Sequence, residues 1–190
     1  MLTAQSPDPI KARLLVVCAI AGDREAFGDL YEIHRPAIYR YVFYRVGEAT
    51  EAEDLTATVF LKAWEALDHY RPGKTPFTAW LYRIAHNLLV DRYRKHKDSE
   101  PLEEHLMDPA VESNTEYQVM YNERAAAISR VLVQLEPIHQ QVLTLRFING
   151  LSHAETAQVI GRMEGTIRVL QHRALVALRT LLDGKVDDYE

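Results

Sequence analysis

Arginine, glutamine and histidine recur along one side of the helix predicted near the C-terminus. Arg168, Gln171 and His172 lie on a different side of that helix from an apolar stripe, and Arg173 lies beside them. Arginine and glutamine side chains can form paired hydrogen bonds with guanine and adenine edges in the major groove of DNA. The pattern therefore indicates a helix that reads bases in duplex DNA.

Catalytic patterns are scarce in the chain. His153-Ala-Glu155 is similar to half of a zinc-deaminase signature, but that signature also needs paired cysteines and Cys18 is the only cysteine. No HExxH zinc motif, phosphate-binding P-loop or GxSxG nucleophile motif occurs. We therefore expect no enzyme activity, no metal and no cofactor.

Charge is distributed unevenly along the chain. The net charge of −5 and the pI near 5.9 argue against a simple nucleic-acid binder, which is usually basic. Residues 98–123, however, hold eight acids and no lysine or arginine, so the rest of the chain carries +3. Residues 83–97 are locally +4. Basic residues at the end of a helix also suit its dipole, which is the alternative account of this cluster.

The elements that would position these residues are all helical by their apolar spacing, and no run of alternating residues indicates a strand. Pro36 is expected to kink or divide the second helix. The proline- and acid-rich stretch 98–114 is typical of a linker, and the chain lacks a signal-peptide layout. The expected helices cover 11–21, a second from about 23 with apolar positions through Val42, and then 51–67, 77–96, 115–135, 137–147, 152–160 and 164–182.

The predicted helix 51–67 is unusual because it carries two apolar stripes. One contains Leu55, Val59 and Ala63, and the other contains Phe60 and Trp64. A helix that is apolar on two sides either lies deep in a bundle or offers one side to a partner. Both interpretations stay open for Phe60 and Trp64.

The C-terminal segment has the outline of a helix-turn-helix. Ser152 and Glu155 form a capping box, Gly161 makes a turn, and a longer basic helix follows. An ordinary helical hairpin can imitate this pattern. The sequence alone leaves that alternative open.

Several segments together resemble the extracytoplasmic-function subfamily of bacterial sigma-70 RNA polymerase sigma factors. Residues 145–175, LRFINGLSHAETAQVIGRMEGTIRVLQHRAL, are similar to its region 4, whose usual text is close to G-L-S-x-x-E-I-A-x-x-L-G-x-x-E-G-T-V-R. Upstream, AGDREAFGDLYEIH (21–34), AEDLTATVFLKAW (52–64) and FTAWLYRIAHNLLVDRYRKHK (77–97) resemble consecutive pieces of region 2. The matches follow the family order and cover most of the chain.

The resemblance implies a role for each basic segment. The final helix would read the −35 promoter element through Glu164, Gly165, Thr166, Arg168, Gln171, His172 and Arg173. The loop at 71–77 and the helix after it would read and hold the −10 element through Lys74, Thr75, Phe77, Arg83, Asn87, Arg92, Arg94 and Lys95. An unstacked base needs a pocket, and its backbone needs cations. Asn87 and His172 could instead be plain surface residues, and Trp80 is interpreted as core.

The resemblance also implies a contact between the third helix and core polymerase. Its residues would be Glu53, Asp54, Leu55, Thr58, Phe60, Leu61 and Trp64. The chain departs from the family at Ala57-Thr58, where Gln-Glu is common, and at Met163, where Ser or Pro is common. Serine at this position would cap the last helix. Met163 is therefore expected to lower the stability by about 1 kcal/mol relative to serine, and it can shift the start of that helix.

The sequence thus predicts an all-α protein with an N-terminal bundle (9–97), an acidic linker (98–124) and a C-terminal helix-turn-helix domain (125–183). The resemblance implies a cytoplasmic sigma factor without membrane insertion. Its expected partners are core RNA polymerase at the clamp and flap, promoter DNA and an anti-sigma factor. The acidic linker is either a solubilising tether or a segment suited to a nucleic-acid channel. The alternative function is a stand-alone helix-turn-helix regulator that acts as a dimer.

Overall fold

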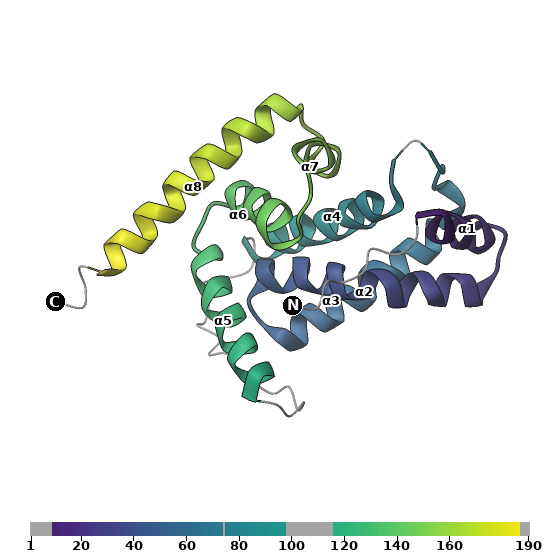
Figure 1. Ribbon diagram of the computed structural model, residues 1–190, viewed down its shortest axis with the longest axis horizontal. Coiled ribbons are helices and arrows are strands. Elements are labelled where there is room, and N and C mark those ends of the chain that lie inside the picture. Colours follow the sequence, from purple (N-terminus) through teal and green to yellow (C-terminus); the bar gives the residue numbers. More distant parts are fainter. Residues whose placement is uncertain (1–8, 74, 98–115, 187–190) are drawn as a thin grey trace.

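Every regular element in the part of the chain that the structure describes, residues 9–73, 75–97 and 116–186, is helical, as predicted (Figure 1). The structure is a computed structural model. The predicted linker 98–114 lies outside the described residues. The elements are α1 (Pro9–Ile20), α2 (Arg24–Val46), α3 (Ala49–Glu65), the 3-10 turn η1 (Leu67–His69), α4 (Phe77–Lys97), α5 (Glu116–Leu132), α6 (Pro137–Leu143), the π-helical turn η2 (Thr144–Ile148), α7 (His153–Ile160) and α8 (Glu164–Val186).

The longest N-terminal helix, α2, has a defined beginning and end. The Asp23 carboxylate accepts hydrogen bonds from the backbone N–H groups of Glu25 and Ala26, and so caps donors that the first turn leaves unpaired. Gly47 ends the helix with a φ of +86°, and its N–H donates to the Phe43 carbonyl at 2.8 Å. Pro36 lies inside α2 and does not divide it. Beyond the proline, Ile38, Tyr41 and Val42 are fully buried in the core, which holds this part of the helix in place.

The N-terminal core lies where α2 meets α1, α3 and α4. Its fully buried residues are Leu30, Ile38, Tyr41, Val42, Ala52, Val59, Ala63, Leu81, Ala85 and Leu89. The α3 helix packs against both α2 and α4, so its core side is enclosed between them. This packing decides which residues of α3 and α4 are exposed.

The helix-turn-helix is formed by α7 and α8. The Ser152 hydroxyl accepts from the Glu155 N–H, and the Glu155 carboxylate accepts from the Ser152 N–H, which confirms the predicted capping box. Gly161 has a φ of +73°, a conformation that glycine adopts without strain, and turns the chain into α8. Ile167 and Ala174 are fully buried on the side of α8 that packs on the neighbouring helices.

The two halves of the chain are joined by hydrogen bonds to the end of α2. The Gln140 amide of α6 donates to the carbonyls of Tyr44 at 2.9 Å and of Arg45 at 3.3 Å. These carbonyls belong to the last turn of α2, where a helix has no further N–H groups of its own to offer, and the Arg45 carbonyl also accepts from the Tyr93 hydroxyl of α4 at 2.7 Å. The Arg45 guanidinium in turn donates to the Pro137 carbonyl at 2.6 Å. A residue of α6 thus caps a helix that ends more than 90 positions earlier.

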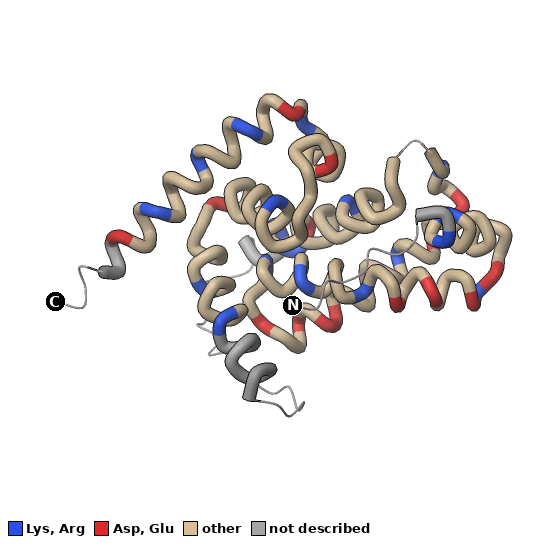
Figure 2. Tube along the Cα trace, viewed as in Figure 1, with Lys and Arg blue, Asp and Glu red and all other residues tan. Residues whose placement is uncertain are grey.

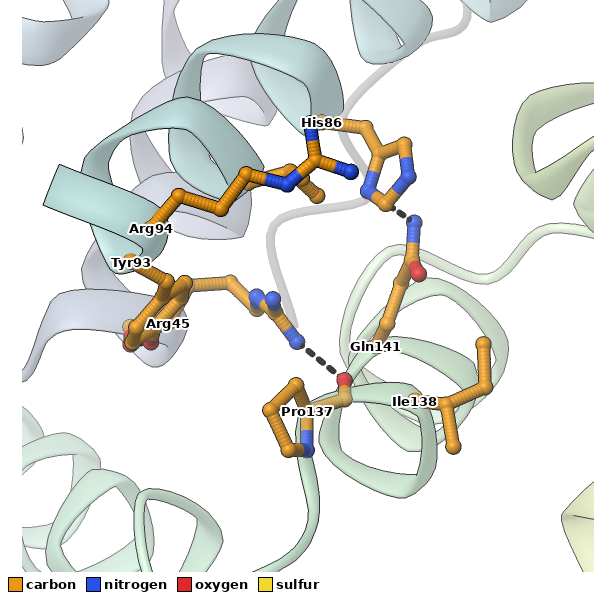
Figure 3. A pocket seen from close by; sticks show the side chains of 8 residues that line it. Arg45, His86, Tyr93, Arg94, Pro137, Ile138 and Gln141 are labelled. Carbon is orange, nitrogen blue, oxygen red and sulfur yellow. Dashed lines mark hydrogen bonds between the residues drawn. The ribbon is translucent and has the colours of Figure 1, made fainter. Parts of the chain in front are cut away.

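A second set of contacts joins α4 to the C-terminal half. The Gln141 amide lies 2.7 Å from His86 Nδ1, and the Asn149 amide donates to the Tyr82 hydroxyl at 2.9 Å. Burial, with a smaller contribution from Arg45, lowers the pKa of His86, so its neutral ring can accept the Gln141 hydrogen bond. Figure 3 shows His86 and Gln141 facing each other, with Arg45 and Pro137 nearby. These residues line a pocket of about 340 Å³ between the two halves. The side of α4 that carries Tyr82 and His86 is therefore covered.

Replacing Gln140 with leucine is expected to destabilise the protein by about 2 kcal/mol, because the Tyr44 carbonyl loses this donor, while the Arg45 carbonyl keeps the Tyr93 hydroxyl. The residue is 2% exposed, so water cannot replace the amide. Urea unfolding monitored by circular dichroism measures the effect. Gln134→Leu is the matched control, since Gln134 is exposed and its amide donates only to Arg130 in its own segment. Equal losses in the two variants would contradict the capping role.

Within the described ranges, none of the helices has the length and apolar character needed to cross a bilayer.

Candidate nucleic-acid interface

One side of α8 is exposed and carries basic residues together with the apolar Val169, Leu175 and Val176, while the other packs on α6 and α7. Basic residues recur along this helix in Figure 2. Arg168 donates to the Glu164 carboxylate at 2.6 Å, and this pair lies one turn from the start of the helix. Thr166 is half-buried. The exposed residues of the predicted −35 set are Glu164, Gly165, Arg168, His172 and Arg173.

Gln171 lies at the edge of the exposed side and is half-buried. Its Oε1 accepts a hydrogen bond from Arg146 Nε at 2.9 Å. Arg146 also donates through Nη1 to the Leu151 carbonyl, which lies just before α7. Sequence reasoning missed Arg146 because its segment was expected to be the end of a regular helix. It belongs instead to the π-helical turn η2, a local irregularity that the apolar pattern does not reveal.

The beginning of α7 is fixed by charge as well as by capping. Hydrogen bonds from the Ser152 side chain and backbone hold the pKa of Glu155 below its usual value, and the nearby Arg146 guanidinium adds to the effect. The anionic carboxylate at the first turn also suits the helix dipole. Arg146 therefore lies next to both helices of the motif.

Met163 occupies the position directly before α8. The N–H groups of Thr166 and Ile167 donate to its carbonyl at 3.0 and 3.2 Å, and its side chain is 79% exposed. The helix starts at Glu164, as predicted, so the departure at Met163 does not move its start. The methionine side chain has no oxygen that could cap the first turn.

Replacing Met163 with serine is expected to stabilise the protein by about 1 kcal/mol, because a hydroxyl at this position can accept from a first-turn N–H. The methionine is mostly exposed, so little buried area is lost. Thermal unfolding checks the gain. Arg162→Ser, one residue earlier and also exposed, is the control and should show no gain. A similar rise in both variants would point to a general effect of removing the longer side chains.

The second candidate surface is one side of α4. Arg83, Asn87 and Arg94 are exposed there, at spacings of four and seven residues that keep them on one side of a helix. Arg92 is only partly exposed and forms an ion pair with Glu51 of α3. Lys74 and the side chain of Lys95 lie outside the described part of the chain. This exposed side of α4 lies next to the side that the C-terminal half covers.

Phe77, which was predicted to help hold the −10 element, is buried. The residue is 8% exposed, and its ring lies 5.4 Å from both Tyr70 and Trp80 and 5.5 Å from His34 between centroids. Phe77 starts α4 and closes the core below the preceding loop. Trp80 packs in the same cluster, as interpreted. Thr75 is half-buried, and its carbonyl accepts from the Tyr70 hydroxyl at 2.6 Å.

The apolar residues of α3 divide differently from the predicted stripes. Phe60 is 4% exposed and packs edge-on against Tyr31 at 4.8 Å, which supports the core interpretation of the two left open for it. Leu61 and Trp64 are 59% and 36% exposed. Trp64 also contacts Phe27 at 4.9 Å, and these two rings line a hollow with Arg24.

The other members of the predicted polymerase-binding set lie earlier on α3. Glu53 and Asp54 are exposed, and Leu55 and Thr58 are half-buried. The Thr58 hydroxyl donates to the Asp54 carbonyl within the helix at 2.9 Å. Large apolar side chains left in water beside a polar rim are typical of a protein-binding surface.

Comparison with known proteins identifies the family. Residues 30–99 match Sigma-70 region 2, and residues 131–180 match Sigma-70 region 4. The ECF RNA polymerase sigma factor BldN of Streptomyces coelicolor is 39% identical over 181 residues, covering 94% of this chain and 69% of that protein. The ECF RNA polymerase sigma factor SigW of Bacillus subtilis is 30% identical, covering 85% of this chain and 91% of that protein.

The fold has a matching relative among solved structures. CnrH, solved in complex with the cytosolic domain of CnrY, superposes with a TM-score of 0.70 at 28% identity and covers 92% of this chain and 98% of its own. The similarity extends through both halves of the chain. The helix-turn-helix and the exposed sides of α4 and α8 are consistent with these similarities. Sigma factors direct transcription initiation and are not enzymes. The chain belongs to the extracytoplasmic-function sigma factors.

Proposed function

We propose that this chain binds core RNA polymerase and directs it to promoters by reading −35 and −10 elements and helping to open the DNA. The observation that carries the proposal is the presence of two separate basic surfaces, on α4 and α8, together with an exposed apolar pair on α3. One DNA-reading helix would suffice for a simple regulator. A second basic surface and a protein-binding surface suit a factor that works on the polymerase.

We assign the −35 element to the exposed side of α8. The pair between Arg168 and Glu164 holds the guanidinium close to the start of the helix, where base contacts are made in a helix-turn-helix. His172 and Arg173 follow on the exposed side, and Gly165 and Thr166 lie at the helix start. Arginine supplies donors for guanine or for phosphate.

We assign the −10 element to the exposed side of α4 and the loop before it. Arg83 and Arg94 supply cations for the backbone, and Asn87 between them supplies an amide for a base edge. Lys74, Thr75, Arg92 and Lys95 complete the proposed set. Phe77 is withdrawn from it because its ring is buried.

We assign the contact with the polymerase clamp to α3. Leu61 and Trp64 provide the apolar centre, and Glu53, Asp54, Leu55 and Thr58 provide its surroundings. The flap is the second proposed contact region of the polymerase. The domains proposed for these tasks are 9–97 and 125–183, with 98–124 as the linker, whose last residues, 116–124, belong to α5.

We further propose a cytoplasmic location and a protein inhibitor of the anti-sigma type. The support is that CnrH was solved in complex with the cytosolic domain of a second protein, CnrY. The stand-alone dimeric regulator is not favoured, because the matches to both region 2 and region 4 leave no separate sensing domain in the matched segments.

Binding to purified bacterial core polymerase, followed by transcription from a randomised promoter library, tests this function. We expect a one-to-one complex and new start sites that share two sequence elements upstream. A dimer that occupies duplex sites in the absence of polymerase, without binding to core, would contradict it.

A further inference from the structure

Arg146 links the start of the helix-turn-helix to a predicted base-reading residue. It donates through Nη1 to the Leu151 carbonyl and through Nε to Gln171 Oε1, the latter at 2.9 Å. The first partner precedes α7 and the second lies in the middle of α8. Arg146 is half-buried in η2, so its guanidinium is held between the two helices.

These bonds settle which end of the Gln171 amide faces Arg146. An arginine N–H can only donate, so the amide atom that it meets must be the oxygen. Among the described residues, Gln171 Nε2 makes no hydrogen bond, and it is not a buried atom without a partner. The amide NH₂ is therefore the group of Gln171 that is available to a ligand of α8.

We infer that Arg146 is a positioning residue for promoter recognition: it fixes the Gln171 amide so that its NH₂ reads an acceptor atom on one base of the −35 element. The inference rests on the proposed function, because it requires α8 to lie in the major groove. Arg146 itself makes no base contact in this account. Its role is to set the orientation of a side chain that would otherwise rotate freely.

The fixed orientation has a consequence for the base that is read. Guanine offers N7 and O6, adenine offers N7, and thymine offers O4, and all of these accept a hydrogen bond in the major groove. Cytosine offers only its N4 amino group, which donates. We therefore expect the strand position next to Gln171 to discriminate against cytosine by about five- to tenfold.

The central experiment compares full-length Arg146→Ala, Gln171→Ala and the double variant, each with core polymerase on a promoter library randomised through the −35 element. Both single variants should lose discrimination at the same base pair and keep it elsewhere. The double variant should lose no more than either single variant, because the two residues act as one unit. Arg179→Ala, which removes another exposed α8 arginine paired only with Asp183, should leave the profile unchanged.

Gln171→Glu keeps an oxygen for Arg146 and removes the NH₂ donor. A carboxylate accepts from the cytosine amino group, so this variant should reverse the preference and favour cytosine at that position. The Gln171→Glu variant keeps both hydrogen-bond acceptors of Arg146. Thermal unfolding of each variant checks that the fold is kept. Gln171→Glu therefore tests the orientation of the Gln171 amide even if Arg146→Ala lowers the stability of the protein.

Two outcomes would overturn the inference. One is a uniform loss across all library sequences in Arg146→Ala, which indicates a phosphate contact or a purely structural role. The other is loss of discrimination at different base pairs in the two single variants. Failure of the proposed function is distinguishable, since the unmodified chain and Arg179→Ala would then also direct no promoter-specific transcription.

Discussion

Replacing both Leu61 and Trp64 with alanine is expected to weaken binding to core RNA polymerase by about 100- to 1,000-fold. Exposed aromatic and aliphatic side chains at the centre of an interface commonly supply most of its binding free energy. Leu61 is 59% exposed and Trp64 is 36% exposed, one turn apart on α3. Titration of labelled core polymerase with each variant measures the dissociation constant.

The controls separate binding from folding. Leu14 and Val17 on α1 are also exposed apolar residues, and their replacement by alanine should leave the affinity unchanged. Trp64 contacts Phe27, so its loss also removes packing. Leu61→Asp leaves that contact in place and should still weaken binding at least tenfold. Unchanged affinity in both Leu61 variants would place the polymerase contact elsewhere.

The second large effect concerns acid stability through His34. This residue is 8% exposed and lies beside the Phe77 ring. Burial disfavours the charged imidazolium and lowers the pKa of His34 to about 4. In the unfolded chain the pKa of histidine is about 6.5, so the unfolded state binds a proton more readily than the folded state.

Stability should therefore fall as the pH drops from about 6.5 towards 4, since protons then favour the unfolded chain. Between pH 7.5 and 4.5 the His34 contribution is about 2.5 kcal/mol. Urea unfolding at the two pH values measures this loss, which should be smaller by that amount in His34→Gln. His69→Gln, at an exposed histidine, should retain the full loss. The same loss in all three proteins would assign the effect to other groups.

Local patterns predicted the helices well, because apolar spacing and capping act within a few residues. Ser152 and Glu155 could be paired from their spacing alone, and Gly161 could be placed at a turn. Phe60 and Phe77 are buried although both belong to the predicted binding sets, because periodicity shows that a helix has an apolar side but not which neighbour covers it. Tyr31 covers Phe60 from another helix.

Contacts between distant segments left no local pattern to detect. The bond from Arg146 to Gln171 depends on a π-helical turn, and the amide of Gln140 reaches carbonyls about 95 positions earlier. The sequence shows Gln140 and Gln171, but not which group each amide will contact. The candidate site was therefore predicted at the level of the helices, and its internal hydrogen bonds required the structure.

The capping of α2 by Gln140 also sets an order for biosynthesis. The chain is made from its N-terminus, so α2 emerges before the residue that completes its last turn exists. The N-terminal bundle can collapse around Leu30 and Ile38, but the end of α2 acquires its final partners only after α6 has been translated. Contacts that close such long loops form slowly. The junction between the halves therefore cannot form before α6 has emerged, and a nascent chain that stalls before residue 140 lacks the Gln140 contacts at the end of α2.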